Sequence, residues 1–261
     1  MTQQLSRLTL ALQLDMPIDR VQAGRLGPHL QGVLMESIAS DYAQTLHSSR
    51  VNPYSQCALG RVGTLLDWQV STLTDEANSH IVQPLTQDSF SGFSIRAAGL
   101  SATVTGRTLE HLQLSELSRT FYASPEAYRF RVHFLTPTAF KQAGEYVFWP
   151  EPRLVFQSLA MKYSAIVDDE EPDEGLVDEF GRAIRLTSFR VASQRFAIGT
   201  ARVPGFTGSA VFTVKGADCF VSYVTALLRF GEFSGCGIKS SLGMGAIRVE
   251  LLPSTRKGAS E

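Results

Sequence analysis

The sequence predicts an α+β fold in which the element order βαββαβ occurs twice along the chain. Three observations support this prediction. Apolar side chains alternate with period two at residues 5–14 and again at 128–134, which is typical of half-buried strands. Helical apolar stripes lie downstream of both segments, at 28–46 and at 218–229. The 261 residues, of which 44% are hydrophobic, suffice for two domains of ordinary size.

The N-terminal half predicts the first βαββαβ unit. Its first strand, at 5–14, places four leucines on one face. Pro28 suits the first turn of the helix expected over 28–46, and the segment before it is expected to be a loop. A strand at 64–73 follows, then a helix that begins after Thr74, and finally one or two strands within 90–105.

The C-terminal half predicts the same order a second time. The expected elements are a strand at 128–134, a helix at 151–166, strands at 183–198 and 201–215, a helix at 218–229 and a strand at 246–252. This order is the ferredoxin-like topology, which is also that of the RNA-recognition module (RRM-like). We therefore expect one such domain at 1–110, a linker at 111–127, a second at 128–252 and a tail at 253–261.

Composition excludes several classes of protein. No apolar run approaches the roughly 20 residues of a membrane helix, and the first strand lacks the features of a signal peptide, so we expect a cytoplasmic protein. The three cysteines, Cys57, Cys219 and Cys236, form no pair with the spacing of a zinc site. We expect no metal and no cofactor.

The charges are unevenly distributed, although the net charge is only −1. Six acidic residues fall within 168–174, and five arginines follow without an acid between them: Arg182, Arg185, Arg190, Arg195 and Arg202. Positive charge gathered on one face is typical of phosphate binding. A solvated strand face is the alternative interpretation.

The most specific segment is 231–245, which has five glycines between a predicted helix and the last strand. Glycine permits a positive φ, and successive N–H groups in such a loop can bind anionic oxygens. Lys239 lies at its centre beside Ser240 and Ser241, and all three side chains can donate to a phosphate. The segment is no nucleotide-binding P-loop, because it follows a helix and lacks that motif.

This loop resembles the Gly-x-Gly-x-Lys-x-Ser-Leu-Gly-x-Gly signature of the CRISPR repeat-processing endoribonucleases, which belong to the repeat-associated (RAMP) RNA-binding superfamily. The matching residues are Gly235, Gly237, Lys239, Ser241, Leu242, Gly243 and Gly245. The segment 134–140 and the run 30–32, followed by His47, resemble the same family in the same order. The resemblance covers nearly the whole chain.

The resemblance implies a metal-independent endoribonuclease that binds CRISPR repeat RNA and releases guide RNAs. The RNA's own 2′-hydroxyl attacks the adjacent phosphate and leaves a 2′,3′-cyclic phosphate. Such a reaction needs a base, an acid and positive charge near the phosphorane. Subunits of a CRISPR effector complex are further candidate partners, and we expect a monomer or a homodimer.

His47 is the candidate base or acid, because an imidazole titrates near neutral pH. Arg50 would stabilise the phosphorane, and Tyr42 is a candidate acid, although its place in the apolar stripe also suits the core. The candidate RNA-binding residues are Gly235, Gly237, Lys239, Ser240, Ser241, Gly243, Gly245, Arg129, Arg131, Arg185, Arg190 and Arg195.

Two other functions stay open at this point. Several relatives carry a tyrosine where this chain has Met35, and some carry a lysine shortly after the histidine, which is absent here. These departures favour a non-catalytic RNA-binding subunit of a CRISPR effector complex, whereas His47 favours the nuclease. A module that binds a small anion at the glycine loop is the third alternative.

Overall fold

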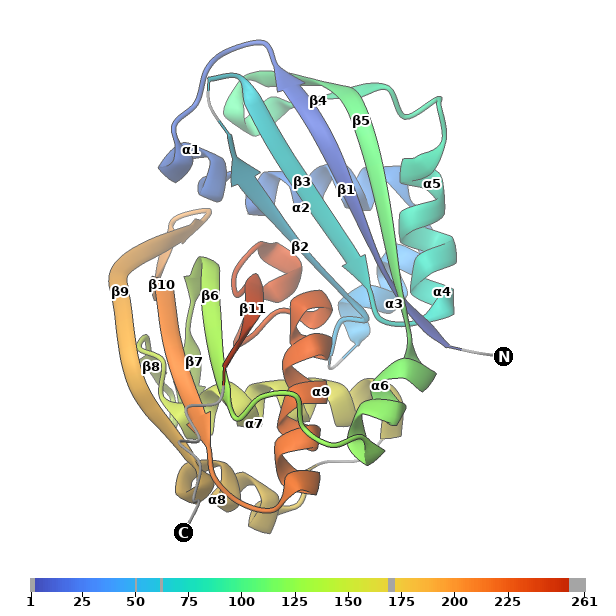
Figure 1. The fold of residues 1–261 in the computed structure, drawn as a ribbon. Helices are drawn as coiled ribbons and strands as arrows, with labels where there is room; N and C mark the ends of the chain where they lie inside the picture. Colours follow the sequence, from blue (N-terminus) through green and yellow to red (C-terminus); the bar gives the residue numbers. More distant parts are fainter. Residues whose placement is uncertain (1–2, 50, 62, 169–171, 254–261) are drawn as a thin grey trace, which may run out of the picture.

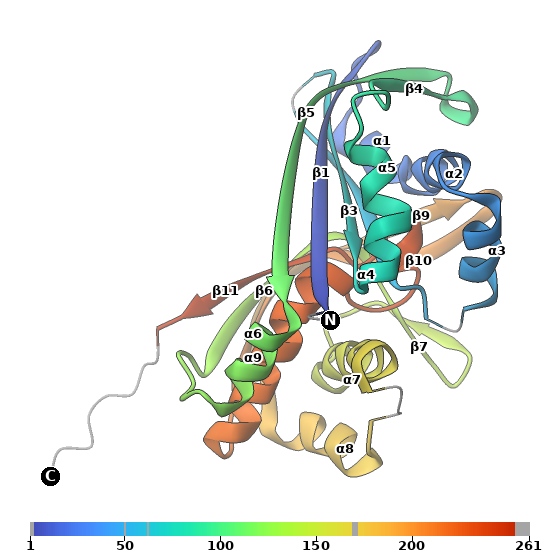
Figure 2. The same ribbon diagram turned by 90° about the vertical axis from the view of Figure 1, so that its right-hand side faces the viewer.

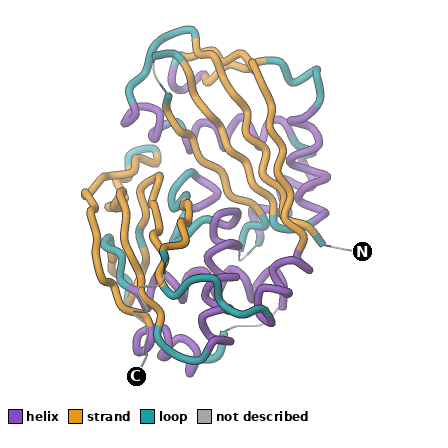
Figure 3. The backbone as a smooth tube through the Cα atoms, in the orientation of Figure 1, coloured by secondary structure: helices purple, strands orange, loops and turns teal. Residues whose placement is uncertain are grey.

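The computed structural model describes residues 3–49, 51–61, 63–168 and 172–253. It contains two large antiparallel sheets with helices packed on one face of each, and a separate two-stranded sheet (Figure 1). The alternation of strands and helices along the tube in Figure 3 repeats once, so the predicted second copy of the unit is present.

The N-terminal sheet has the strand order β2-β3-β1-β5-β4. The strands are β1 (Gln4–Leu14), β2 (Tyr54–Gly60), β3 (Leu65–Thr72), β4 (Gly92–Ile95) and β5 (Leu100–Gln113). Without the short β4, this is the order of a ferredoxin-like sheet. The strand β2 was not predicted, because its residues do not alternate between apolar and polar in sequence.

The single helix predicted at 28–46 is wrong. The α-helices in this half are α1 (Arg20–Arg25), α2 (Gly27–Ser37), α3 (Ser40–Ser48), α4 (Asp75–Ala77) and α5 (Gln83–Thr86), and a π-helical segment (Asn78–Val82) joins α4 to α5. The chain is extended at Ile38, with φ −110° and ψ 163°, so α2 and α3 are separate. The expected loop before Pro28 contains α1, where Asp19 and Gln22 form a capping box.

The C-terminal sheet has the order β11-β6-β10-β9, which is again ferredoxin-like. The strands are β6 (Arg129–Thr138), β9 (Ile184–Ile198), β10 (Ala201–Val214) and β11 (Ile247–Leu252). The helices α7 (Pro152–Tyr163) and α9 (Asp218–Ser234) pack on one face of this sheet through a core rich in phenylalanine. The additional elements are the hairpin β7 (Phe140–Gln142) and β8 (Glu145–Val147), and the helix α8 (Glu174–Ala183).

The two halves of the protein are in direct contact with each other. The helix α6 (Leu114–Tyr122) connects them and packs along α9 (Figure 2). Leu5 and Leu73 of the N-terminal sheet are buried in the C-terminal core. The end of α9 therefore lies against the N-terminal sheet, and the segment after α9 lies between the two halves.

No helix within the described ranges combines the length and apolar character that crossing a membrane requires. In the same ranges, no three His, Cys, Asp or Glu side chains gather as metal ligands would.

Candidate functional site

The glycine-rich segment forms a compact loop between α9 and β11. Gly235, Gly237, Gly243 and Gly245 have φ values of 68°, 80°, 109° and 74°, and Lys239 has φ 58°. A side chain at Gly245 would also clash, because its Cβ would lie 2.0 Å from the carbonyl oxygen of Cys236. The glycines are therefore needed for the path of the backbone.

Most N–H groups of this loop bind protein acceptors. Those of residues 235–238 and 242–245 donate to carbonyls or, in the case of Gly237, to the hydroxyl of Ser158 at 2.7 Å. The expectation that the N–H groups of these glycines lie open to a phosphate is therefore wrong. The glycines shape the loop, and its capacity to bind an anion is concentrated at 239–241.

Side chains from both halves hold the carboxyl end of α9, where the loop begins. Helix-terminal carbonyls have no partner within the helix. Here Arg7 donates to the carbonyl of Glu232 at 2.5 Å, and the Ser55 hydroxyl donates to that of Phe233 at 2.5 Å. Lys162 donates to the carbonyl of Ser234 at 3.1 Å. The two cations also match the negative end of the helix dipole.

Lys162 also binds the loop itself, a role that was not predicted from the sequence. Its ammonium also donates to the carbonyl of Gly235 at 3.0 Å and to the Ser240 hydroxyl at 3.1 Å. Burial lowers the pKa of this ammonium from 10.5 to about 8. Ser158 and Lys162 stand four residues apart on α7, and this spacing, which places both on one helix face, was the available signal.

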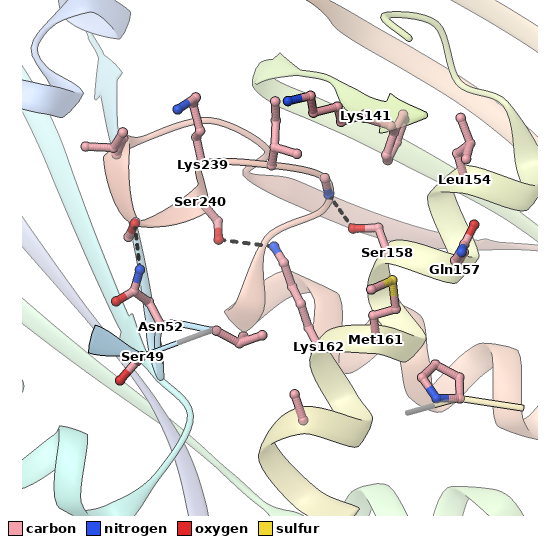
Figure 4. A pocket seen from close by; sticks show the side chains of 18 residues that line it. Ser49, Asn52, Lys141, Leu154, Gln157, Ser158, Met161, Lys162, Lys239 and Ser240 are labelled. Atoms are coloured by element: carbon pink, nitrogen blue, oxygen red, sulfur yellow. Dashed lines mark hydrogen bonds between the residues drawn. The ribbon is translucent and has the colours of Figure 1, made fainter. Parts of the chain in front are cut away.

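A cleft of about 880 Å³ opens beside the loop. One wall comes from the segment after α3, with Ser49 and Asn52, and the opposite wall comes from α7 and the β7–β8 hairpin (Figure 4). The loop residues Lys239 and Ser240 lie between these walls. The cleft therefore joins the N-terminal half, the glycine loop and the C-terminal half.

His47 is close to this cleft along the chain. It is exposed in the last turn of α3, two residues before Ser49, which lines the cleft. Figure 2 shows the end of α3 above α7 and β7. The imidazole is therefore not sealed in the core. The candidate Arg50 lies outside the described residues.

Tyr42 lies in the core of the N-terminal half. Its ring is buried and stacks on that of His80, with the ring centroids 4.2 Å apart. Burial, and to a lesser extent the charge of Glu76, raises the pKa of Tyr42 to about 12. Met35 packs against the same core. This geometry favours a packing role for Tyr42 over a role as a proton donor.

The polar residues of the loop differ in what they contact. Lys239 is exposed in the cleft, whereas the hydroxyl of Ser240 is bound by Lys162. Ser241 is buried, and its hydroxyl accepts from the side chain of Asn52 at 3.3 Å. Ser241 therefore joins the loop to the N-terminal half, and Lys239 is the loop cation that faces solvent.

Four of the candidate arginines share one face of the C-terminal sheet. The strand register places Arg129 and Arg185 on either side of Thr213, and Arg190 beside Ser209. Arg131, opposite Val211, lies between these positions and pairs with Glu250 at 2.7 Å. Alternation along β9 places the exposed Arg195 on the opposite face of the sheet. Because α7 and α9 cover the other face of the sheet, these four arginines form a basic surface separate from the cleft.

Comparison with known proteins gives one consistent result. The family description of the CRISPR-associated endoribonuclease Cas6 matches residues 132–247. A CRISPR-associated endoribonuclease Cas6 of Mycobacterium tuberculosis is 64% identical over 257 residues, which are 98% of this chain and 82% of the relative. The enzyme of the same name from Streptococcus thermophilus is 35% identical over 231 residues, which are 86% of this chain and 91% of that relative.

Solved structures agree on the fold. A product complex of Thermus thermophilus Cas6 superposes with a TM-score of 0.77 at 22% identity, covering 94% of this chain and 99% of the other. This likeness confirms the predicted tandem ferredoxin-like fold. The identity to the two relatives over most of this chain shows that it belongs to the CRISPR-associated endoribonuclease Cas6 family.

Proposed function

We propose that this protein binds CRISPR repeat RNA and cuts it without a metal ion, which leaves a 2′,3′-cyclic phosphate on the guide RNA. The observation that carries this proposal is that His47 is exposed two residues before Ser49, which lines the cleft in which Lys239 is also exposed. The names of the curated relatives, which are endoribonucleases, support the same reaction class.

The chemistry needs few groups. A 2′-hydroxyl attacks the adjacent phosphorus, the 5′-oxygen of the next nucleotide leaves, and one proton is removed while another is supplied. His47 exchanges a proton with one of these oxygens. The ammonium of Lys239 stabilises the negative charge that builds up on the phosphorane.

RNA outside the cleft would contact the basic surface formed by Arg129, Arg131, Arg185 and Arg190. Contacts of this kind neutralise phosphates and position the RNA without reading its sequence. The cleft and the basic surface therefore have different tasks: the first performs the cut and the second holds the flanking RNA.

The test is cleavage of a labelled CRISPR repeat RNA in EDTA. The wild type is expected to cut at one site, with a cyclic phosphate detected on the upstream product by mass spectrometry. His47→Ala is expected to bind this RNA but not cut it. The matched control is His29→Ala, because His29 is an exposed histidine on α2, and it is expected to cut normally. Loss of activity in EDTA, or normal cutting by His47→Ala, contradicts the mechanism.

Lys239→Ala tests the contact with phosphate. The variant is expected to bind more weakly and to reduce the slope of log affinity against log salt by about one. An unchanged slope would mean that the lysine does not neutralise a phosphate.

A non-catalytic RNA-binding subunit is the second candidate function. The observation that favours it is that no tyrosine lines the cleft in the described part of the chain, since Tyr42 is buried and Met35 packs in the core. Selective binding of repeat RNA by the wild type without cutting would select this alternative.

A further inference from the structure

Three aromatic side chains are exposed within four residues of one another. Tyr146, Phe148 and Trp149 have exposed fractions of 39%, 45% and 49%. In the described part of the chain they are three of five exposed aromatic residues. Exposed apolar surface that gathers in one place marks a binding site more often than it marks chance.

The hairpin that carries Tyr146 is fixed in place. Ala143 and Gly144 form its two-residue turn with φ values of 48° and 89°, as a type I′ turn requires. On one side of the hairpin, Phe140 is buried and Val147 packs against the C-terminal core. The opposite side is therefore held rigidly toward solvent.

The exposed side of the hairpin combines a ring with a cation. Lys141 pairs with Tyr146 across the two strands, and directly opposed residues share a face. Lys141 also lines the cleft, and Figure 4 shows it at the same rim as Lys239. The ring thus continues the surface on which the two ammonium groups lie.

The two acids nearest to this side along the chain are Glu145 and Glu151. Alternation along β8 places Glu145 on the other face of the hairpin. The carboxylate of Glu151 caps α7 by accepting from the backbone N–H of Leu154 at 2.7 Å. The exposed side therefore suits a ligand that has both negative charges and flat rings.

We propose that the β7–β8 hairpin is a base-stacking subsite for unpaired nucleotides of the RNA strand in the cleft, an inference that rests on the proposed function. Lys141 and Lys239 bind phosphates of this strand, and the ring of Tyr146 stacks on a base. Phe148 and Trp149 extend the stacking surface toward α7. Every base has a π-face, so the subsite takes single-stranded RNA of any sequence.

Two ligands separate stacking from charge. One is a short fluorescent oligoadenylate, and the other is an abasic strand of the same length and number of phosphates. The wild type is expected to bind the oligoadenylate more tightly than the abasic strand. Tyr146→Ala is expected to weaken oligoadenylate binding by roughly 5- to 150-fold and to leave the abasic strand unaffected.

The controls isolate the ring. Tyr146→Phe retains the ring and is expected to bind as the wild type does. Tyr122→Ala removes another exposed tyrosine, 92% exposed on α6, and is expected to leave both affinities unchanged. Lys141→Gln is expected to weaken both ligands equally, because both carry phosphates.

Cleavage of repeat RNA by the same variants distinguishes this inference from the proposed function. Tyr146→Ala is expected to raise KM for the repeat RNA with little change in kcat. If the wild type cuts but Tyr146→Ala binds oligoadenylate unchanged, the subsite is refuted and the nuclease stands. A change of oligomeric state in Tyr146→Ala with unchanged RNA affinity would also refute it, because the rings would then contact protein. If the wild type binds no RNA, both proposals fail.

Discussion

Replacing Arg7 with methionine should loosen the contact between the two halves of the protein. Arg7 lies on β1, and its side chain is only 17% exposed. One of its terminal nitrogens donates to the carbonyl of Glu232, and its guanidinium lies 4.4 Å from the centroid of the Phe233 ring. The other terminal nitrogen is 3.2 Å from the carboxylate of Glu110.

The magnitude follows from these three contacts. A hydrogen bond from a charged donor stabilises by about 1.5–3 kcal/mol, and a cation over an aromatic ring by about 0.5–2 kcal/mol. The pair with Glu110 adds about 0–1 kcal/mol, because that carboxylate is 55% exposed. Methionine keeps the aliphatic packing and removes the burial penalty of the cation. We therefore expect Arg7→Met to lower the free energy of unfolding by roughly 3 kcal/mol.

Urea unfolding measures this loss with two probes. Fluorescence of the buried Trp68, measured in a Trp149→Phe background because Trp149 also fluoresces, reports on the N-terminal core, and far-UV circular dichroism reports on both halves. The two transitions should separate in Arg7→Met, because the halves would unfold less cooperatively. The control is Arg61→Met, which removes a 2.7 Å pair with Asp67 at a site where Arg61 is 55% exposed, and should cost no more than about 1 kcal/mol. Equal losses in the two variants would refute the reasoning.

Three further predictions concern the loop and the core. Because the pKa of Lys162 is lowered from 10.5 to about 8, the unfolded chain binds more protons than the folded chain between these two pH values. The free energy of unfolding should therefore rise with pH across this range by at most about 3 kcal/mol. Urea unfolding of Lys162→Met should lack this rise. Gly245→Ala should lower the free energy of unfolding by roughly 2 kcal/mol or more, because the backbone there has a positive φ and the added Cβ would clash. The control Gly32→Ala lies in open space on α2 and should raise the free energy of unfolding by about 0.5–1 kcal/mol. A similar effect at both sites would contradict the loop geometry. Tyr42→Phe keeps the stacking on His80, so repeat RNA should be cut at the wild-type rate; a large drop in kcat would instead assign the hydroxyl to catalysis.

Local pattern was sufficient for most of the element types, although not for β2 or for the division between α2 and α3. The period-two alternation at 5–14 and the stripe at 218–229 depend only on which faces of a strand or helix are apolar. The break between α2 and α3 was missed because Ile38 continues the apolar stripe in sequence although its backbone is extended. The strand β2 was missed for a related reason, since both of its faces are largely buried.

The candidate site was likewise predictable only in part from the sequence. The spacing of the glycines with Lys239 identified the loop, because a backbone with positive φ needs glycine wherever it occurs. The sequence did not indicate that Arg7 and Lys162 hold this loop, because these residues lie far from it along the chain and meet it only through packing. The sequence also did not decide whether Tyr42 acts as a proton donor or packs in the core.

Periodicity and glycine spacing were thus enough to predict two βαββαβ units and a loop that suits an anion, since both are encoded by neighbouring residues. Packing decided which polar groups meet: the end of α9 with Arg7, the loop with Lys162, and Lys141 with Tyr146. Contacts of this kind depend on strand register and on the removal of side chains from water, and both are properties of the folded chain as a whole.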